Sequence, residues 1–494
     1  MNQSANTTKT AALVTLVSVF FFWGFVAASN DILIPVFKEK LNLSQGQSQL
    51  VAVAFYVAYT VGSIIYMLLS RLSGGDILNR VGYKNGIAIG LIISAIGTLL
   101  FYPAANSVSF NLFLTGLFIV GLGFSLQQTA ANPLAIVIGD PRKGAQRLSM
   151  AGGINNLGTT IGPLIVSFAI FGAVSNESTG IADINAVKTP YLILGVAFVL
   201  VALIFKYSSL PNKINLEDDA HQPLNADGTT AVHRSSALKY PQLVLGMIGI
   251  FVYVGVEVAT AANLPEFMKQ YIKLEDGSPI PTSSIAPYVS LYWASLMMGR
   301  WTAAVGAFNV SESTRKILNF VMPYLAFGVF LLVNIIAGHS IQPFLPYAGI
   351  ILIMIIGDIM SKGNPARQLL IFSSMGIAAL LVGMLTNGLV SVYAFTSVGL
   401  FCSTLWPCIF TLAIAGLGRY TNEGSSFLIM MIMGGGIISY FQGYLAADNL
   451  LGIHWSYIVG VACFVYLAYY AIKAKSILKG QGIDYDRLES AGGH

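Results

Sequence analysis

The sequence contains about fourteen apolar stretches of roughly twenty residues, long enough to cross a ~30 Å hydrocarbon core as helices. They run at about 11–36, 49–70, 84–103, 109–138, 148–173, 189–206, 243–268, 286–306, 317–338, 343–360, 367–386, 390–417, 424–447 and 454–473. Only 10% of the residues are charged, against about 25% in a soluble domain. Lipid must therefore cover most of the surface, and in lipid the backbone is satisfied only by helices or closed barrels. The sequence predicts an all-α polytopic membrane protein with about 14 transmembrane helices.

A polar segment at 207–240 separates six of these stretches from the other eight. We expect an N-terminal six-helix bundle at 1–206, a cytoplasmic linker at 207–240, a C-terminal bundle at 241–475 and a cytoplasmic tail at 476–494. With the N-terminus in the cytoplasm, eleven Lys and Arg of the first half and linker fall inside and three outside. This bias predicts an inner-membrane protein with both termini cytoplasmic.

Two of the carboxylates within membrane-length stretches, Asp31 and Glu257, stand out. Asp31 is near the end of the first stretch, and Glu257 is roughly seven residues from the end of the uninterrupted apolar run 243–264 in the seventh. Such residues cost several kcal/mol in the bilayer, so they usually face a partner or a wet cavity. Together they point to an ion-coupled carrier. The alternatives are a polar helix end at the outer interface for Asp31, and a structural salt bridge or hydrogen bond for Glu257.

Other classes of protein fit the sequence poorly. The net charge of +5 comes from basic residues scattered over short loops, so nucleic-acid binding is not expected. The three cysteines lie in apolar stretches without metal-ligand spacing. No nucleophile–base pair or metal set appears, so we expect neither an enzyme nor a cofactor.

The loop after the second stretch carries a recognisable pattern of glycines and charges. Its residues are Gly75, Asn79, Arg80, Gly82 and Lys84. They match the G-x-x-x-D/N-R-x-G-x-K/R loop of the major facilitator superfamily, which the chain therefore resembles. The resemblance implies two six-helix bundles that alternate access to a substrate. The stretches near 317–360 are then an inserted helix pair in the C-terminal bundle.

Longer motifs narrow the resemblance. They lie at 30–35, 128–133, 155–163, 253–257, 424–427 and 434–436. These segments resemble the fucose–galactose–glucose symporter family, and in particular its glucose/galactose branch. The resemblance implies a central site for a neutral hexose and symport with a monovalent cation.

The resemblance also suggests roles for single residues. In the proton-coupled branch the position of Gln128 is a glutamate, whereas an amide cannot carry a proton. Cation coupling, by H⁺ or Na⁺, therefore falls on Asp31, with Glu257 as a second carboxylate and a possible sodium site near Asp31. The candidate sugar ligands are Gln128, Asn132, Asn155, Asn156, Glu257, Asn263 and, by stacking, Trp406. The family's glutamine near the fifth-span asparagine is replaced by Gly152.

Several alternatives remain open. Asn132 and Asn155 could only tie helices together, and Trp406 could be core packing. A proton-coupled exporter of small hydrophobic compounds is the nearest rival, supported by Gly158-x-x-x-Gly162 and Pro163, although this spacing also favours close helix packing. A sugar sensor that does not transport is a further alternative. The expected partners are a sugar, a monovalent cation and the bilayer, with the protein as a monomer.

Overall fold

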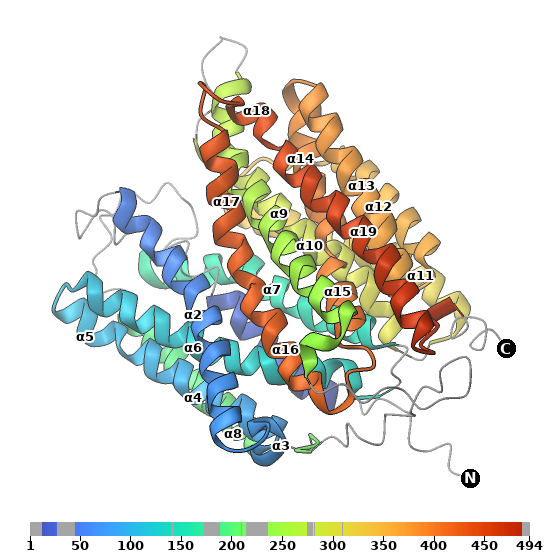
Figure 1. Ribbon diagram of the computed structural model, residues 1–494. Coiled ribbons are helices and arrows are strands. Elements are labelled where there is room, and N and C mark those ends of the chain that lie inside the picture. Colours follow the sequence, from blue (N-terminus) through green and yellow to red (C-terminus); the bar gives the residue numbers. More distant parts are fainter. Residues whose placement is uncertain are drawn as a thin grey trace. The chain divides into compact units, whose positions relative to one another are not determined.

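The structure is a computed structural model, and the elements below can be followed in Figure 1. It describes residues 12–26, 45–139, 143–171, 188–208, 210–213, 236–273, 280, 282–308 and 310–486. The chain forms two compact units. Unit 1 comprises 1–141, 157–217 and 419–433, and unit 2 comprises 142–156, 218–418 and 434–494. Because α7 and the segment around α16 and α17 are divided between them, the units are not simple halves of the chain. The division at 206 and 241 stays a prediction.

Unit 1 is built from helices throughout its described residues. They are the helix Ala12–Val26, α2 (Gln45–Leu72), α3 (Ile77–Val81), α4 (Tyr83–Leu99), α5 (Phe101–Asn106), α6 (Phe110–Val137), the second part of α7 (Gly144–Phe171), α8 (Lys188–Tyr207), α16 (Thr421–Met430) and the 3₁₀ turn η8 (Met431–Met433).

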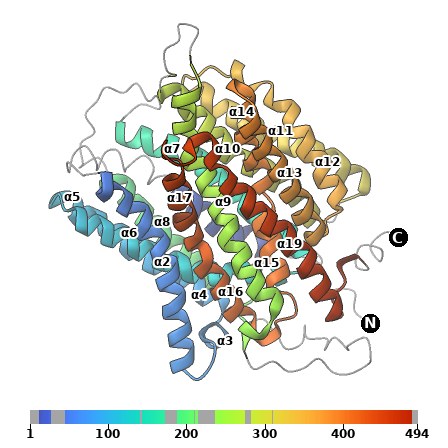
Figure 2. The ribbon, with the colours of Figure 1, turned by 45° about the horizontal axis from the view of Figure 1, so that its top comes forward.

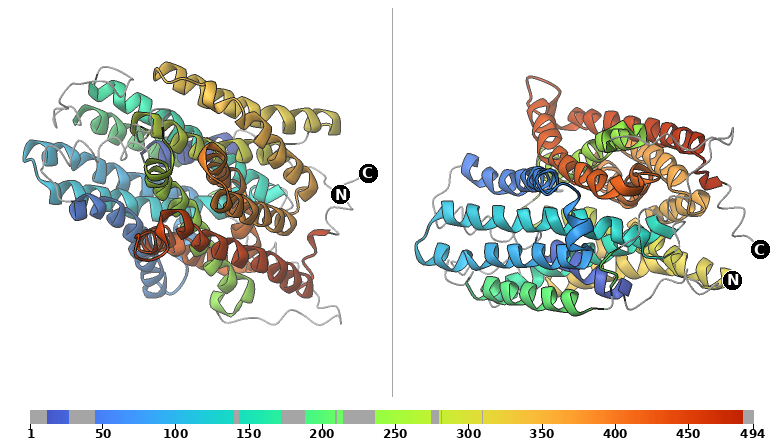
Figure 3. Two further views of the ribbon diagram at one scale, coloured as in Figure 1. Left: turned by 90° about the horizontal axis from the view of Figure 1, so that it is seen from above. Right: turned by 60° about the horizontal axis from the view of Figure 1, so that its bottom comes forward.

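The centre of unit 1 is the contact of α4 with α6, and α8 and α2 pack on the outer sides of this pair. Figure 3 shows these blue, cyan and green helices running lengthwise beside one another. Glycines allow the close approach, because a Cβ on Gly97 would lie 2.7 Å from the Gly116 carbonyl oxygen. Small residues at a helix contact are typical of membrane bundles.

The predicted packing role of Gly158 and Gly162 is confirmed. A Cβ on Gly158 would lie 2.4 Å from the carbonyl oxygen of Phe21, and one on Gly162 would lie 3.2 Å from that of Phe25. The helix Ala12–Val26 thus rests directly on the glycine face of α7. The glycine spacing has a structural reason that requires no ligand.

Unit 2 is also built from helices throughout its described elements. They are the first part of α7, η4 (Ala237–Lys239), α9 (Pro241–Tyr271), α10 (Thr282–Ala304), η5 (Val305–Ala307), α11 (Glu312–Ile336), η6 (Gln342–Phe344), α12 (Tyr347–Ser361), α13 (Pro365–Leu385), α14 (Gly388–Cys402), α15 (Leu405–Ile414), α17 (Gly434–Leu445), α18 (Gly452–Ser456) and α19 (Ile458–Gly480).

In unit 2, α9 packs between α17 and α19, and α13 packs against α19 and α14, as Figure 2 shows. The helix pair predicted near 317–360 corresponds to α11 and α12. α11 packs on α10, and α12 reaches α13 and α14. Large apolar side chains such as Ile353 and Ile356 of α12 are exposed, as expected of a surface that faces lipid.

Each predicted apolar stretch contains helix in its described residues. Ten of the helical segments are apolar and long enough to cross a membrane, and Ala12–Val26 and Tyr191–Tyr207 are shorter apolar helices within the described residues. α7 and α10 are long helices but are not among the ten. The all-helical membrane fold is thus confirmed, whereas the count of fourteen spans stays a prediction.

Candidate functional site

Glu257 lies close to the middle of α9, 16 residues after Pro241 and 14 before Tyr271. The sequence placed it nearer to the outer end, because the apolar stretch seemed to stop before Pro265. The helix continues through this proline, which membrane helices tolerate. The hydroxyl of Tyr253, one turn earlier, donates a hydrogen bond to Glu257 Oε2, and Tyr292 of α10 donates to the Glu257 carbonyl oxygen (2.8 Å).

Arg300, one turn before the end of α10, supplies a cation to this carboxylate. Its Nη2 lies 3.9 Å from Glu257 Oε2, and the two side chains are only 11% and 15% exposed. Nη2 also donates to the Tyr253 hydroxyl (3.3 Å). Nη1 donates to Asn156 Oδ1 (2.6 Å) and to the Gly152 carbonyl oxygen (3.3 Å) of α7. The cluster therefore joins a buried ion pair to one predicted sugar ligand, Asn156.

The same guanidinium contacts the break between α14 and α15. In a continuous helix the carbonyl of Ser403 would accept from the N–H of residue 407, but that residue is Pro407, which has none. Arg300 Nε donates to this carbonyl instead (3.0 Å). An unsatisfied carbonyl is costly inside a membrane protein, so Arg300 stabilises the break.

Two glycines of α7 make room for this arrangement. A Cβ on Gly152 would lie 3.1 Å from Arg300 Cδ, and a Cβ on Gly153 would lie 2.6 Å from Trp301 Cδ1. The indole nitrogen of Trp301 donates to the Gly153 carbonyl (3.1 Å). The space left by the missing side chain of Gly152 is thus filled by Arg300.

Trp406 and Asn263 behave differently. Trp406 follows the helix break, and its ring lies 6.2 Å from that of Tyr253, at the edge of the Glu257 cluster. Asn263 lies six residues beyond Glu257, about 9 Å along the helix, and its amide donates to the Ala259 carbonyl of its own helix (2.8 Å). The structure brings Trp406, but not Asn263, to the cluster.

Unit 1 holds the other predicted amides on α6. Gln128 Nε2 donates to the hydroxyl of Tyr59 on α2 (3.0 Å). Its neighbour Gln127 is fully used in packing, because it accepts from the indole of Trp23 (2.8 Å) and donates to Ser94 (3.0 Å).

One turn further, Asn132 is buried and its Nδ2 has no hydrogen-bond partner among the described residues. In unit 2, both polar side-chain atoms of Gln442 on α17 share this property. A buried polar group without a partner costs about 1–3 kcal/mol, so such amides are candidates for binding a hydroxyl or water. Gln442 is not among the residues predicted from the sequence.

Asn155 and Asn156 lie where α7 passes from unit 2 to unit 1. Asn156 is buried against Arg300, whereas Asn155 is half-buried. The predicted amides therefore fall into two groups, with Gln128 and Asn132 together in unit 1 and Asn156 in the cluster of unit 2.

The glycine-rich loop between α2 and α4 is tied to two neighbouring segments. Asn422 of α16 donates to Asn79 Oδ1 (3.1 Å). Gly82 has φ +91°, and a Cβ there would lie 2.3 Å from Asn212 Oδ1, so both its conformation and its space require glycine. Lys84 donates to the Ser208 carbonyl (3.0 Å).

The other two motif residues, Gly75 and Arg80, contact each other across the turn before α3. The exposed side chain of Arg80 packs over Gly75, with Nη2 3.9 Å from where a Cβ would lie. Asp76 caps α3 by accepting from the Leu78 N–H (2.8 Å) and also accepts from the Tyr66 hydroxyl (2.6 Å). The motif thus builds a compact turn that joins α2, α3 and α4.

These features can be compared with known proteins. A model of the Major Facilitator Superfamily matches residues 12–344. The chain belongs to the major facilitator superfamily. It is 32% identical over 461 residues to a glucose/galactose transporter of Brucella abortus, covering 93% of each chain. It is 26% identical to the L-fucose-proton symporter of Escherichia coli, over 92% of this chain and 91% of that one.

A solved structure supports the same fold. The transporter matches FucP in the outward conformation with a TM-score of 0.68 and 25% identity, over 94% of this chain and 98% of that one. The family resemblance read from the motifs is therefore confirmed. Fold and relatives are those of transporters, so the expectation that the protein is not an enzyme is also confirmed.

Two predicted features of this transporter need separate mention. Asp31 and the sodium site near it lie outside the described residues. Arg300 was missed by sequence reasoning, because a basic residue close to a helix end reads as an ordinary inner-side charge. The signal that could have found it is the pair Gly152–Gly153, because adjacent glycines on a helix leave room for large side chains of a neighbouring helix.

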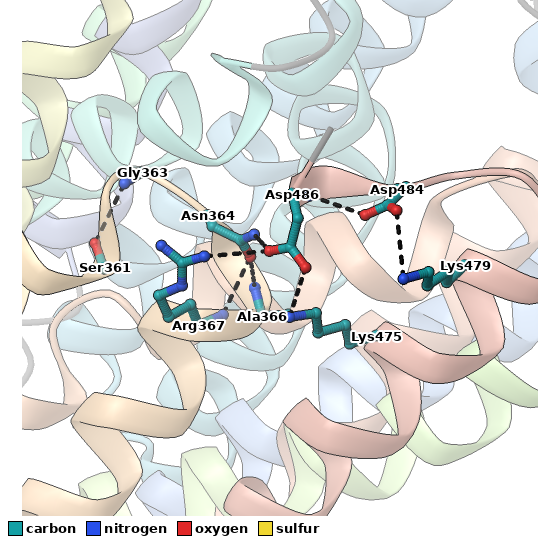
Figure 4. Close-up of polar contacts among 9 residues, drawn as sticks. All are labelled: Ser361, Gly363, Asn364, Ala366, Arg367, Lys475, Lys479, Asp484 and Asp486. Carbon is teal, nitrogen blue, oxygen red and sulfur yellow. Dashed lines mark hydrogen bonds and ion pairs between the residues drawn. The ribbon is translucent and has the colours of Figure 1, made fainter. Parts of the chain in front are cut away.

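The last described residues of the transporter, 481–486, fold back onto unit 2 (Figure 4). Asp486 Oδ1 accepts from Asn364 Nδ2 (3.0 Å) and Arg367 Nη2 (3.2 Å), and Oδ2 lies 2.7 Å from Lys475 Nζ. The hydrogen bond from Lys475 lowers the pKa of Asp486, and the nearby basic groups act in the same direction. Asn364 also caps α13, so the tail joins the ends of α13 and α19.

Proposed function

We propose that the protein is a secondary active transporter of the cytoplasmic membrane that carries a neutral, glucose- or galactose-like hexose together with a monovalent cation by alternating access. The observation that carries the proposal is the cluster around Glu257. It holds a partly accessible carboxylate at mid-helix, beside a cation, an amide and an aromatic ring. The names of the relatives support the sugar as substrate.

In this proposal the polar groups have distinct roles. Gln128 and Asn132 of unit 1 bind sugar hydroxyls, and the partnerless Nδ2 of Asn132 supports this role. In unit 2, Trp406 offers a ring face for stacking, while Asn156 and Glu257 accept hydrogen bonds. Asp31 and Glu257 take up the coupling cation, either H⁺ or Na⁺. A neutral sugar needs directional hydrogen bonds rather than a net counter-charge, and amides supply them.

The remaining parts of the proposal concern the whole molecule. Both termini lie in the cytoplasm, the protein works as a monomer, and the motif loop regulates the conformational cycle. The rival exporter loses its support, because Gly158 and Gly162 are explained by packing against Phe21 and Phe25.

Counterflow in proteoliposomes tests the function directly. Vesicles loaded with unlabelled glucose, galactose or fucose should take up the same labelled sugar. A pH or sodium gradient should then drive accumulation, and the effective gradient identifies the cation. Exchange of no hexose, together with efflux of hydrophobic dyes, would contradict the proposal in favour of the exporter.

A further inference from the structure

Arg300 is a buried cation that the proposed binding and coupling roles leave without a function. It lies one turn before the end of α10, yet only 11% of its side chain is exposed. An arginine with a purely structural role would need to stabilise only one neighbouring element. This side chain contacts three other elements, namely α7, α9 and the α14–α15 break.

The two sides of the guanidinium face different kinds of partner. Nη2 is directed to the hydrogen-bonded Tyr253 and Glu257 of α9, with the Tyr253 hydroxyl at 3.3 Å and Glu257 Oε2 at 3.9 Å. Nε and Nη1 are directed to neutral acceptors, the Ser403 carbonyl at 3.0 Å and Asn156 Oδ1 at 2.6 Å. Both of these contacts are shorter than the 3.9 Å contact with the carboxylate. Arg300 therefore keeps good hydrogen bonds even if its contact with the carboxylate is lost.

The backbone is adapted to this side chain. A Cβ on Gly152 would lie 3.2 Å from Arg300 Nη1, and that glycine's carbonyl accepts from the same nitrogen (3.3 Å). The position of the guanidinium is thus set by the helix that also carries Asn156.

We propose that Arg300 is a positioning residue that serves as the built-in counter-cation of Glu257. A proton or sodium ion reaches this carboxylate only by taking the place of the guanidinium, which then rests on its neutral acceptors Ser403, Asn156 and Gly152. The inference rests on the proposed cation coupling. It extends that coupling in two ways. Arg300 sets the cation affinity of Glu257, and it connects Glu257 to the helix break before Trp406.

Few other charges can influence Glu257. The titratable groups that interact with it are Tyr253 of α9, Tyr292 and Arg300 of α10, and Cys402 of α14. The adjacent α15 and α17 contain no Asp, Glu, Lys, Arg or His. Arg300 is the one cation of this set within the described residues.

Three other described helices carry charges that lie farther from Glu257. On α7, the buried Arg147 is nine residues before Asn156, about 13 Å along that helix. α19 carries lysines only from Lys473 onward, beyond the residue Tyr470 that donates to the Gln242 carbonyl at the start of α9. His454 of α18 packs on Phe267, ten residues beyond Glu257. Both are therefore about 15 Å or more away along α9.

The test is a cation titration of the purified full-length protein. Its Tm is followed against pH, and separately against sodium chloride with choline chloride holding ionic strength. The Glu257 component is the part of this response that Glu257→Gln removes. In Arg300→Gln, the midpoint of the Glu257 component should move to a cation activity at least about tenfold lower, which for protons is about one pH unit higher. The reason is that an opposite charge within about 4–6 Å shifts the pKa of a carboxylate by 1–3 pH units. Arg300→Lys, which keeps the charge, should restore most of the wild-type response.

A second variant guards against failure to fold. Gly152→Ala keeps every charge but presses on Arg300 Cδ and Nη1, so it should shift the same component in the same direction by a smaller amount. Trp301→Phe is the control, since it removes the contact with the Gly153 carbonyl and leaves the ion pair intact. The inference is overturned if the Glu257 component is unchanged in Arg300→Gln. If Arg300→Gln does not fold, an unchanged component in Gly152→Ala overturns it. So does an equal shift in Trp301→Phe.

Hexose counterflow of the wild type is measured in parallel and separates the two proposals. If no hexose is exchanged but Arg300→Gln has the expected effect on the Tm response, only the proposal that the substrate is a hexose is rejected. Hexose exchange without that effect rejects the role of Arg300 alone.

Discussion

Replacing Glu257 by glutamine removes one charge and nearly no volume. At 3.9 Å and an effective dielectric constant of about 20, the Coulomb energy of the pair is about 4 kcal/mol, and desolvation of both ions offsets much of it. Arg300 retains the Ser403 and Gly152 carbonyls and Asn156 as acceptors. We therefore expect a loss of about 1–3 kcal/mol of stability, the usual cost of an imperfectly paired buried group.

The functional effect should be larger than this cost suggests. A glutamine cannot take up a proton and has no negative charge to balance a sodium ion, so Glu257→Gln should change sugar affinity and alter the pH or sodium dependence of transport. Thermal unfolding and counterflow at several pH values and sodium concentrations measure both effects. Glu266→Gln is the matched control, because that glutamate is exposed near the end of the same helix. A Glu257→Gln protein with lower Tm but wild-type affinity and coupling would show that the pair is only structural.

The remaining predictions concern separate parts of the molecule. Gln128→Ala and Asn132→Ala should each weaken sugar binding by about 1–3 kcal/mol, roughly five- to 150-fold, as measured by ligand-induced stabilisation. Unchanged affinity in both would place the sugar elsewhere. Gly158→Leu should lower Tm strongly, because even its Cβ would lie 2.4 Å from the Phe21 carbonyl, and a variant that keeps its Tm would contradict that packing. The pKa of Asp486 is lowered in the folded protein, so its contribution is present above the ordinary aspartate pKa and is lost as pH falls through the folded value. Since it is a third exposed, Asp486→Asn should cost at most about 1 kcal/mol and remove that acid-side loss from the pH dependence of Tm, whereas an unaltered profile would contradict the contribution.

The class of fold could be predicted from the sequence because lipid leaves little choice. Apolar stretches of membrane length must satisfy their own backbone, so helices follow from composition alone. The turn at the motif loop could also be predicted from the sequence, because Gly82 adopts φ +91° and leaves space for Asn212, and both require a glycine. Glycine spacing at Gly158 and Gly162 likewise predicted a close helix contact that the structure contains.

The use of each polar side chain depended on tertiary structure. Asn263 stays a predicted sugar ligand, but its amide nitrogen bonds to its own helix. Gln127 rather than Gln128 takes the contacts of the packed core. Amides of one type on one helix can bond to backbone, side chain or ligand, and sequence spacing does not distinguish these partners.

Arg300 shows this limit most clearly. Residues 43 and 144 positions away in sequence, Glu257 and Asn156, are its partners. Helical periodicity predicts which residues share a face of one helix, but not which faces of distant helices meet. The sequence by itself determined a helical membrane transporter with carboxylates and amides inside it. Only the packing of α7, α9, α10 and the α14–α15 break decided that one guanidinium would join a carboxylate to the carbonyl left open by Pro407, because partners so far apart in the chain meet only when their helices pack.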